Sequence, residues 1–413
     1  MAEVDWPRWL RAGDHLVCSH MSAEPVALLQ SLAACAQLPQ PLHLMLGVPF
    51  SQAAAGLPAG CELTTYGGMG SAGAIAQKRP VRFSLLPYGR TAAVYEDGAW
   101  RCDVALVALG RAPDGRLFLG PSHGAVLAAA GRARHVIAQV SPHVPCLPGA
   151  EWPAEIPIAA MLETDDGPPS LNDAVPGETQ QAIARHVAAL VPDGACLQVG
   201  IGSLPSAALQ VLASHRHLGI HTGMLTDPLW RLVTGGAADH SRKGVDVGVA
   251  VTGSACGTPG LYRALDGHAG IALREPGYTH DARVIASQPD MFCLNSALEV
   301  DLLGNVNAEA VVQPDGRWRF VGGVGGLPDF VRAAVRAPRG QAVIALAART
   351  RIVARLSGPC TIAASDADVV ATEHGVARLR DATLGERVRR MLAIAHPDDR
   401  DALAAQARGL GLS

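Results

Sequence analysis

The sequence predicts an α/β protein built from two domains with largely parallel sheets. Its 413 residues exceed the usual size of one domain and suit two domains of about 150–200 residues each. Short continuous apolar runs alternate with helical stretches in both halves, and such runs are typical of parallel strands covered on both faces. A stretch rich in Pro, Gly and Asp lies between them at about 148–176. We therefore predict domains at 1–176 and 177–413.

Individual elements follow from these runs. In the first half, strands are expected at 15–19, 42–46, 103–109 and 135–140, and helices at 24–34 and 124–133. Ser22 is a candidate cap for the first helix, and Pro25 fits its first turn. In the second half, a helix is expected at 178–190 and strands at 195–199, 245–251, 291–294, 342–346 and 367–371. Strands that alternate with helices imply parallel sheets.

Composition excludes several classes of protein. The net charge of −3 leaves no basic footprint for nucleic acid. The N-terminus lacks the apolar core of a secretory signal, and no segment offers roughly 18 uninterrupted apolar residues, so we expect no membrane span. The nine cysteines are scattered without CxxC spacing, which favours buried thiols in a reducing compartment. Together these features predict a soluble cytoplasmic protein.

Two glycine-rich segments in the second half are candidate ligand loops. A predicted strand runs into Gly200, Ile201 and Gly202 and then into a helix, whose first N–H groups would face an anion. The same glycine pattern after a strand is equally typical of a plain tight turn that binds no ligand. A second loop has exposed backbone that suits an oxyanion hole or the close approach of a thioester. It consists of Gly323, Val324, Gly325 and Gly326.

These loops belong to a series of six motifs. The series is LQVGIGSLP at 197–205, LGIHTGMLTDPLW at 218–230, NSALEVDLLGNVNAE at 295–309, VGGVGGLPDF at 321–330, VVATEHGVARLR at 369–380 and AIAHPDDRDAL at 393–403. In order and separation it resembles the acetyl-CoA hydrolase/4-hydroxybutyrate CoA-transferase family. The family patterns are approximately LGIGxIPxAVL, LGIHTEMxSDG, INSALEVDLTGQVNAD, GVGGQxDF, VVTEYGVAxLRG and IAHPxxR. The match is weaker in the first half, where GDHLVCSHMSAEPVALLQSL at 13–32 resembles the opening strand and helix.

The resemblance implies a fold, a substrate and an assembly. The fold is a pair of related CoA-transferase-type α/β domains of the NagB/RpiA-like kind, with mostly parallel sheets. The substrates are coenzyme A, as an acyl-CoA, and a small acceptor. A homodimer is the expected assembly. All residues of both ligand loops, together with Gly223, are then expected to bind CoA or its thioester.

Two departures from the family patterns concern the reaction. In the family, the glutamate of HTE attacks the thioester and becomes a glutamyl-CoA thioester, which is covalent catalysis by a carboxylate. The matching residue here is Gly223, which has no side chain to attack. The family also reads approximately YVNDP before INSALEV, and His280 stands at the asparagine. An imidazole can act as a general base near neutral pH.

His280, Glu373 and Glu299 are therefore the candidate catalytic residues. Glu373 is expected to line the pocket, where it would position His280 or repel a substrate carboxylate. Glu299 is either a substitute nucleophile or a structural group, because the family keeps this glutamate beside its nucleophile. A lone histidine in a loop is also commonly structural. Cys256 lacks a recognisable base and is expected to be a packed thiol.

Three functions remain open at this stage. The first is acyl transfer from CoA to water or a small nucleophile through a diverged site. The second is conventional CoA transfer between carboxylic acids, and the third is CoA-thioester binding without catalysis. We expect no metal site, because His215, His217 and His221 straddle a helix end and a strand without a suitably spaced carboxylate or cysteine.

Overall fold

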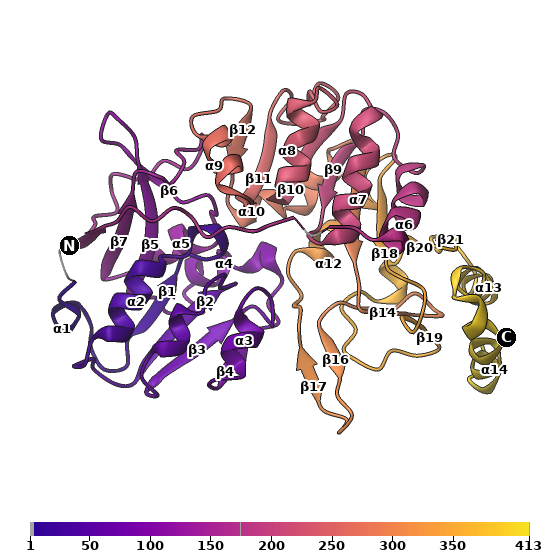
Figure 1. Ribbon diagram of the computed structural model, residues 1–413, viewed down its shortest axis with the longest axis horizontal. Coiled ribbons are helices and arrows are strands. Elements are labelled where there is room, and N and C mark those ends of the chain that lie inside the picture. Colours follow the sequence, from indigo (N-terminus) through magenta and orange to yellow (C-terminus); the bar gives the residue numbers. More distant parts are fainter. Residues whose placement is uncertain (1–3, 174, 413) are drawn as a thin grey trace. The chain divides into compact units, whose positions relative to one another are not determined.

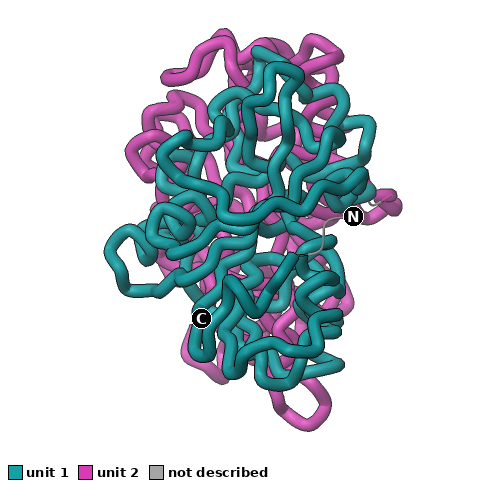
Figure 2. Tube along the Cα trace, turned by 90° about the vertical axis from the view of Figure 1, so that its left-hand side faces the viewer, with its two compact units in different colours: residues 1–172, 251–279 teal, residues 173–250, 280–413 magenta. Residues whose placement is uncertain are grey.

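The computed structural model describes residues 4–173 and 175–412, and Figure 1 shows their helices and strands. These residues form two compact units, which Figure 2 distinguishes by colour. The first unit comprises 4–172 and 251–279, and the second comprises the described residues within 173–250 and 280–413. The segment 251–279 thus belongs to the first unit, whereas the predicted division at 176/177 places it in the second domain.

The first unit is built on a sheet with the strand order β4-β3-β2-β1-β5-β7-β8, in which β6 also pairs with β5. All pairs are parallel except β5 with β6. The strands are β1 His15–Cys18, β2 Leu42–Gly47, β3 Cys61–Thr65, β4 Val81–Phe83, β5 Val104–Arg111, β6 Leu117–Leu119, β7 His135–Ser141 and β8 Ala160–Glu163. In β5, every residue except the last is buried, as expected for a strand covered on both faces.

Short helices connect these strands. They are α1 Trp6–Trp9, α2 Val26–Ala34, α3 Ala72–Ala76, α4 Ala93–Glu96 and α5 Val126–Ala130. The segment 251–279 contributes most of β11 Ala250–Ala255, followed by α9 Pro259–Leu265, β12 Ile271–Leu273 and α10 Pro276–Thr279. The apolar core of this unit is formed mainly by side chains from α2 and the central strands, including Leu28, Leu29, Leu32, Leu44 and Leu106.

The second unit contains a sheet with the order β10-β9-β13-β18-β20-β21. Only the last pair is antiparallel. The strands are β9 Cys196–Val199, β10 Gly219–Leu225, β13 Met291–Ser296, β18 Gln341–Ala345, β20 Val369–Thr372 and β21 Gly375–Arg378. A small sheet joins β14 Glu299–Asp301, β15 Val306–Asn307 and β19 Ile352–Val353, and β16 Ala310–Val312 pairs with β17 Trp318–Phe320.

The helices of the second unit alternate with these strands. They are α6 Glu178–Ala188, α7 Ser203–Val211, α8 Asp227–Thr234, α11 Ala282–Ala286, α12 Leu327–Ala334, α13 Leu384–Ile394 and α14 Arg400–Gly409. None of the helices in the described ranges is long and apolar enough to cross a membrane. The α/β class with mostly parallel sheets is therefore confirmed.

Corresponding strands of the two units share one register. Leu16 of β1 lies opposite Leu44 of β2, and Leu197 of β9 lies opposite Ile220 of β10. Three residues further along, β2 reaches Gly47 and β10 reaches Gly223. The two glycines therefore occupy equivalent positions at the carboxyl ends of equivalent strands, as expected of related units.

Three local predictions were wrong. The strand expected at 245–251 begins only at Ala250, because Asp246 and Gly248 have φ angles of 52° and 79°, which an extended chain does not adopt. Ser22 does not cap α2, since its hydroxyl donates to the carbonyl of Ala255 at 2.7 Å. The region at 148–176 also contains a strand, β8, which pairs with β7.

Candidate active site

The candidate site lies at the carboxyl ends of the central strands of the second unit. His221 and Gly223 belong to β10, and because side chains alternate along a strand they project from the same face. His280 follows α10 and precedes α11. The neighbouring Asp281 fixes this turn by capping α11, since its carboxylate accepts hydrogen bonds from the N–H groups of Arg283 at 2.7 Å and Val284 at 3.1 Å.

The imidazole of His280 lies against two glycines. A β-carbon built at position 223 would lie 3.0 Å from Nε2 and 3.1 Å from Cε1 of His280. One built at position 326 would overlap Nε2 and lie 2.5 Å from Cδ2. At both positions, the β-carbon would lie closer to the His280 ring than an ordinary van der Waals contact allows. The structure therefore brings together Gly223, His280 and Gly326, which are far apart in the sequence, and the ring occupies the space of two missing side chains.

An aromatic ring completes the enclosure of His280. Phe330 of α12 packs edge-on against the His280 ring, with centroids 4.8 Å apart and an angle of 65° between the planes. His280 is only 6% exposed. Burial and, to a lesser extent, the nearby His221 lower the pKa of His280 to about 3. The imidazole is therefore neutral at physiological pH.

The loop at 323–326 leads into α12. Gly325 has a φ angle of +54°, a conformation that favours glycine, and Gly326 directly precedes the helix. From the sequence, we expected the glycines of this loop to let a thioester approach the backbone closely. At Gly326, the missing side chain makes room for His280. The contact with a thioester at Gly323, Val324 and Gly325 stays a prediction.

The loop at 200–202 follows β9 and leads into α7. Gly202 has a φ angle of 122°, and Ile201 is 52% exposed. A β-carbon at Gly200 would lie 3.1 Å from Oδ1 of Asn295. The amide of Asn295 exchanges two hydrogen bonds with that of Gln198, at 3.0 and 2.9 Å. This amide pair fixes the carboxyl ends of β9 and β13 beside the strand that carries Gly223.

Glu299 lies in the small sheet, on β14. Its carboxylate accepts hydrogen bonds from the backbone N–H of Ser357 at 3.1 Å and from the Ser357 hydroxyl at 2.5 Å. The Asn307 amide donates a third at 3.4 Å. These contacts join β14 to the segment that follows β19, as expected for a structural group. A role as substitute nucleophile remains a prediction.

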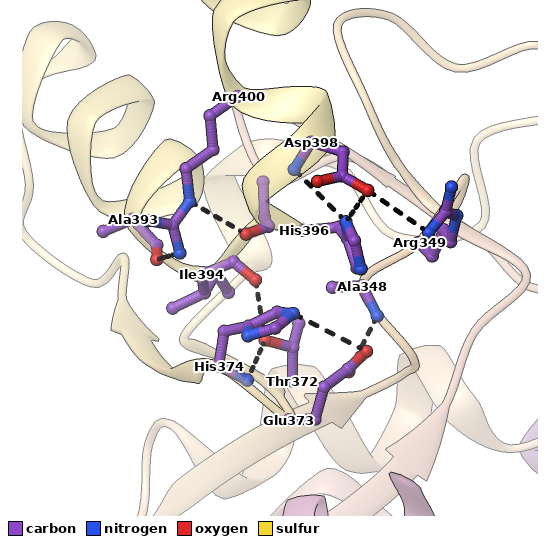
Figure 3. A network of polar contacts seen from close by, with 11 residues as sticks. Ala348, Arg349, Thr372, Glu373, His374, Ala393, Ile394, His396, Asp398 and Arg400 are labelled. Carbon is purple, nitrogen blue, oxygen red and sulfur yellow. Dashed lines mark hydrogen bonds and ion pairs between the residues drawn. The ribbon is translucent and has the colours of Figure 1, made fainter.

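Glu373 lies in the turn between β20 and β21, and Figure 3 shows its surroundings. Its carboxylate accepts a hydrogen bond from the N–H of Ala348 at 2.9 Å and lies 3.9 Å from Nε2 of His374. Strand β20 lies four positions from β10 in the sheet, roughly 19 Å at the usual strand spacing. The contacts of Glu373 thus lie in its own part of the sheet, and a role in positioning His280 stays a prediction.

Other candidates have structural partners. The Sγ atom of Cys256 lies 3.5 Å from the hydroxyl of Ser22, and burial raises the pKa of this thiol to about 11. His217 pairs with Asp239 at 2.8 Å, and Nε2 of His215 lies 3.1 Å from the carbonyl of Val191. Within the described ranges, no three histidine, cysteine or acidic side chains converge as metal ligands.

Sequence reasoning missed Phe330, Gln198 and Asn295 as parts of the site. Phe330 entered the sequence analysis only as the last residue of the motif VGGVGGLPDF. A helix that begins at Leu327 places Phe330 one turn later, where a buried residue is expected. Gln198 and Asn295 each lie near the end of an apolar strand, where a polar residue indicates the carboxyl edge of a sheet. The missing information was which strands are neighbours.

Comparisons with known proteins bear on the family and the fold of the chain. Residues 257–407 match the model of the acetyl-CoA hydrolase/transferase C-terminal domain. The chain is 32% identical over 311 residues to 4-hydroxybutyrate coenzyme A transferase of Clostridium kluyveri, which covers 73% of this chain and 71% of the relative. Among solved structures, RipA from Yersinia pestis superposes with a TM-score of 0.90 at 26% identity, covering 98% of this chain and 96% of that one. The 4-hydroxybutyrate CoA-transferase of Porphyromonas gingivalis has a TM-score of 0.81 at 27% identity, covering 98% and 95%.

Proposed function

We propose, from the premise that this chain belongs to the acetyl-CoA hydrolase/CoA-transferase family, that it transfers an acyl group from CoA directly to water or a small nucleophile. The chain is an acyl-CoA transferase or hydrolase, and its substrates are CoA thioesters. The proposal concerns the reaction type. No glutamyl-CoA intermediate forms, because the residue in place of the family nucleophile is Gly223.

The observation that carries this proposal is the contact between Gly223 and His280. A side chain at position 223 would begin 3.0 Å from Nε2 of His280, so the imidazole stands where the family carboxylate would start. The loss of the carboxylate and the gain of the imidazole therefore form one linked change. A site that had merely lost its nucleophile would have left that space open.

His280 acts as the general base in this proposal. Because its pKa is lowered to about 3, the ring is neutral at pH 7. The ring takes the proton as the O–H or N–H bond of the acceptor breaks and the acceptor bonds to the acyl carbon. When the C–S bond then breaks, the acidic imidazolium returns this proton to the departing thiolate sulfur. General catalysis of this kind typically contributes 10²–10⁴-fold.

The glycine loops supply the remaining functions. The backbone N–H groups at 323–326 and the first turn of α12 stabilise the oxyanion of the tetrahedral intermediate. Gly200, Ile201 and Gly202, at the N-terminus of α7, bind an anionic part of CoA. Both roles depend on backbone atoms and therefore survive the loss of a nucleophilic side chain.

Conventional CoA transfer between carboxylic acids is the second candidate, since relatives bear that name. It requires another carboxylate as nucleophile. The contacts of Glu299 with Ser357 and Asn307 and the sheet position of Glu373 argue against either glutamate in that role.

A thioester-cleavage screen separates these reactions. Small acyl-CoAs would be tested with and without acetate, while free CoA thiol and new acyl-CoA are both measured. We expect thiol release that does not depend on acetate, and no exchange of acyl groups between CoA and acetate. Formation of acetyl-CoA from another acyl-CoA would instead establish conventional transfer, and tight CoA binding without turnover would indicate a binding protein.

The role of His280 is tested by His280→Asn, with His240→Asn as the matched control. His240 is also buried, at 3% exposure, and burial also lowers its pKa, to about 4, but it lies in the loop before β11. We expect the His280 variant to lose about 10²–10⁴-fold in kcat with little change in KM. We expect the control to keep its kcat. Equal losses in both variants would mark His280 as structural.

A further inference from the structure

Two imidazoles flank one aromatic ring in the candidate site. The Phe330 ring is edge-on to His280, with centroids 4.8 Å apart, and also edge-on to His221, with centroids 6.4 Å apart and an interplanar angle of 64°. His221 has no exposed surface, and Phe330 is 2% exposed. All three rings thus lie in one buried cluster beside Gly223.

The contacts of this cluster leave its rings little freedom. The β-carbon positions of Gly223 and Gly326 each lie 3.6 Å from the Phe330 ring as well as close to His280. The His280 ring is therefore closely surrounded by Phe330 and by the two glycines. His221 is held by the register of β10, in which its neighbour Ile220 pairs with Leu197 of β9.

We propose that His221 is a positioning residue for the acyl-transfer reaction, acting on His280 across the Phe330 ring. This inference rests on the proposed role of His280 as the base. His221 has no exposed surface for contact with a substrate, so its effect on the reaction passes through its neighbours. It fixes Phe330, and thereby the direction of the His280 ring.

His221 also has an electrostatic effect. Two imidazoles in one apolar cluster cannot both hold a proton without strong repulsion. Burial, and to a lesser extent the nearby His221, lower the pKa of His280. In the proposed reaction, the protonated His280 is therefore acidic and readily gives its proton to the departing thiolate sulfur. His221 itself gains and loses no proton in that step.

A double-mutant cycle tests this inference in the full-length enzyme. His221→Gln keeps the approximate size of the side chain and removes the imidazole. We expect kcat to fall about tenfold with KM within about twofold, because the change acts on the transition state through His280. In the His280→Asn background, the same substitution should change kcat by less than about twofold, because its target is gone.

A purely structural role for His221 gives a different result. Loss of packing would lower kcat by the same factor in both backgrounds, and that result would overturn the inference. Phe330→Leu provides a second cycle if His221→Gln does not fold, because it breaks the connection and leaves both histidines in place. Its loss of kcat should likewise vanish in the His280→Asn background.

The cycle separates this inference from the proposed function. If His280→Asn alone costs less than about tenfold in kcat, the proposed base is wrong. If His280→Asn costs 10²-fold or more while His221→Gln has equal effects in both backgrounds, only the role of His221 is wrong. His240→Asn serves as the control, since its small effect on kcat should be the same with and without His280.

Discussion

The contact between Gly223 and His280 predicts that one methyl group at position 223 destabilises the enzyme. The substitution Gly223→Ala adds only the β-carbon. Gly223 does not have the left-handed φ that would strain an alanine, so its effect reports the contact alone. The new carbon would lie 3.0 Å from Nε2, 3.1 Å from Cε1 of His280 and 3.6 Å from the Phe330 ring.

The size of the effect follows from the surroundings of the ring. His280 would have to shift by several tenths of an ångström, yet Gly326 and Phe330 already contact it on other sides. Forcing an extra methyl group into such a core costs about 1–3 kcal/mol of unfolding free energy. In the His280→Asn background, the smaller side chain leaves room, so the cost should fall below about 0.5 kcal/mol.

Urea unfolding of the four proteins of this cycle measures the coupling. A change in the midpoint with an unchanged slope gives the difference in stability. Gly409→Ala is the control, because a β-carbon there would meet nothing within 4 Å. The reasoning is refuted if Gly223→Ala is as stable as the wild type, or if it costs the same whether or not His280 is present.

Three further outcomes are expected. Gly326→Ala should lower kcat more than Gly223→Ala does, because its β-carbon would overlap Nε2 of His280; equal activity in steady-state assays would contradict this. Gly223→Glu should gain CoA transfer between acids only together with His280→Asn, since the imidazole fills the space that the carboxylate needs; a gain in the single variant, measured as acyl exchange, would show that the ring moves aside. Burial lowers the pKa values of His20, His240 and His280 to about 4, 4 and 3, so the stability that these neutral rings contribute is complete above pH 6.5. As the pH falls below that value, each ring should cost up to about 1.4 kcal/mol of unfolding free energy per pH unit. Unfolding measured at pH 7, 6 and 5 should show this loss, and a smaller loss in His240→Asn; a stability that does not change with pH would contradict the prediction.

Most strands were predictable from the sequence because they are buried on both faces. Continuous apolar runs identified β1, β2, β5, β7, β9 and β13 within a few residues. The failure at 245–251 has a clear cause, since Val245, Val247 and Val249 suggest a strand although Asp246 and Gly248 adopt left-handed conformations. Apolar patterning reports burial, but it does not report the sign of φ.

The site was only partly predictable. The motifs placed His280 and Gly223 in one family site, although 57 positions separate them in the sequence. Nothing in the sequence indicates that the ring of His280 would fill the space above Gly223 and Gly326. The place of Glu373 in the sheet was not predictable for a related reason, because the order of strands separates β20 from β10. Neighbouring positions in space depend on strand order, which local patterns do not encode.

The most direct test of the account is a search for an acylated or CoA-bound carboxylate during turnover. The wild-type enzyme would be mixed with an acyl-CoA that it cleaves, treated with borohydride, digested and analysed by mass spectrometry. The account predicts that CoA thiol is released while every glutamate and aspartate keeps its mass. A reduced glutamate or aspartate, formed in proportion to the enzyme, would show a carboxylate nucleophile and contradict direct transfer assisted by His280.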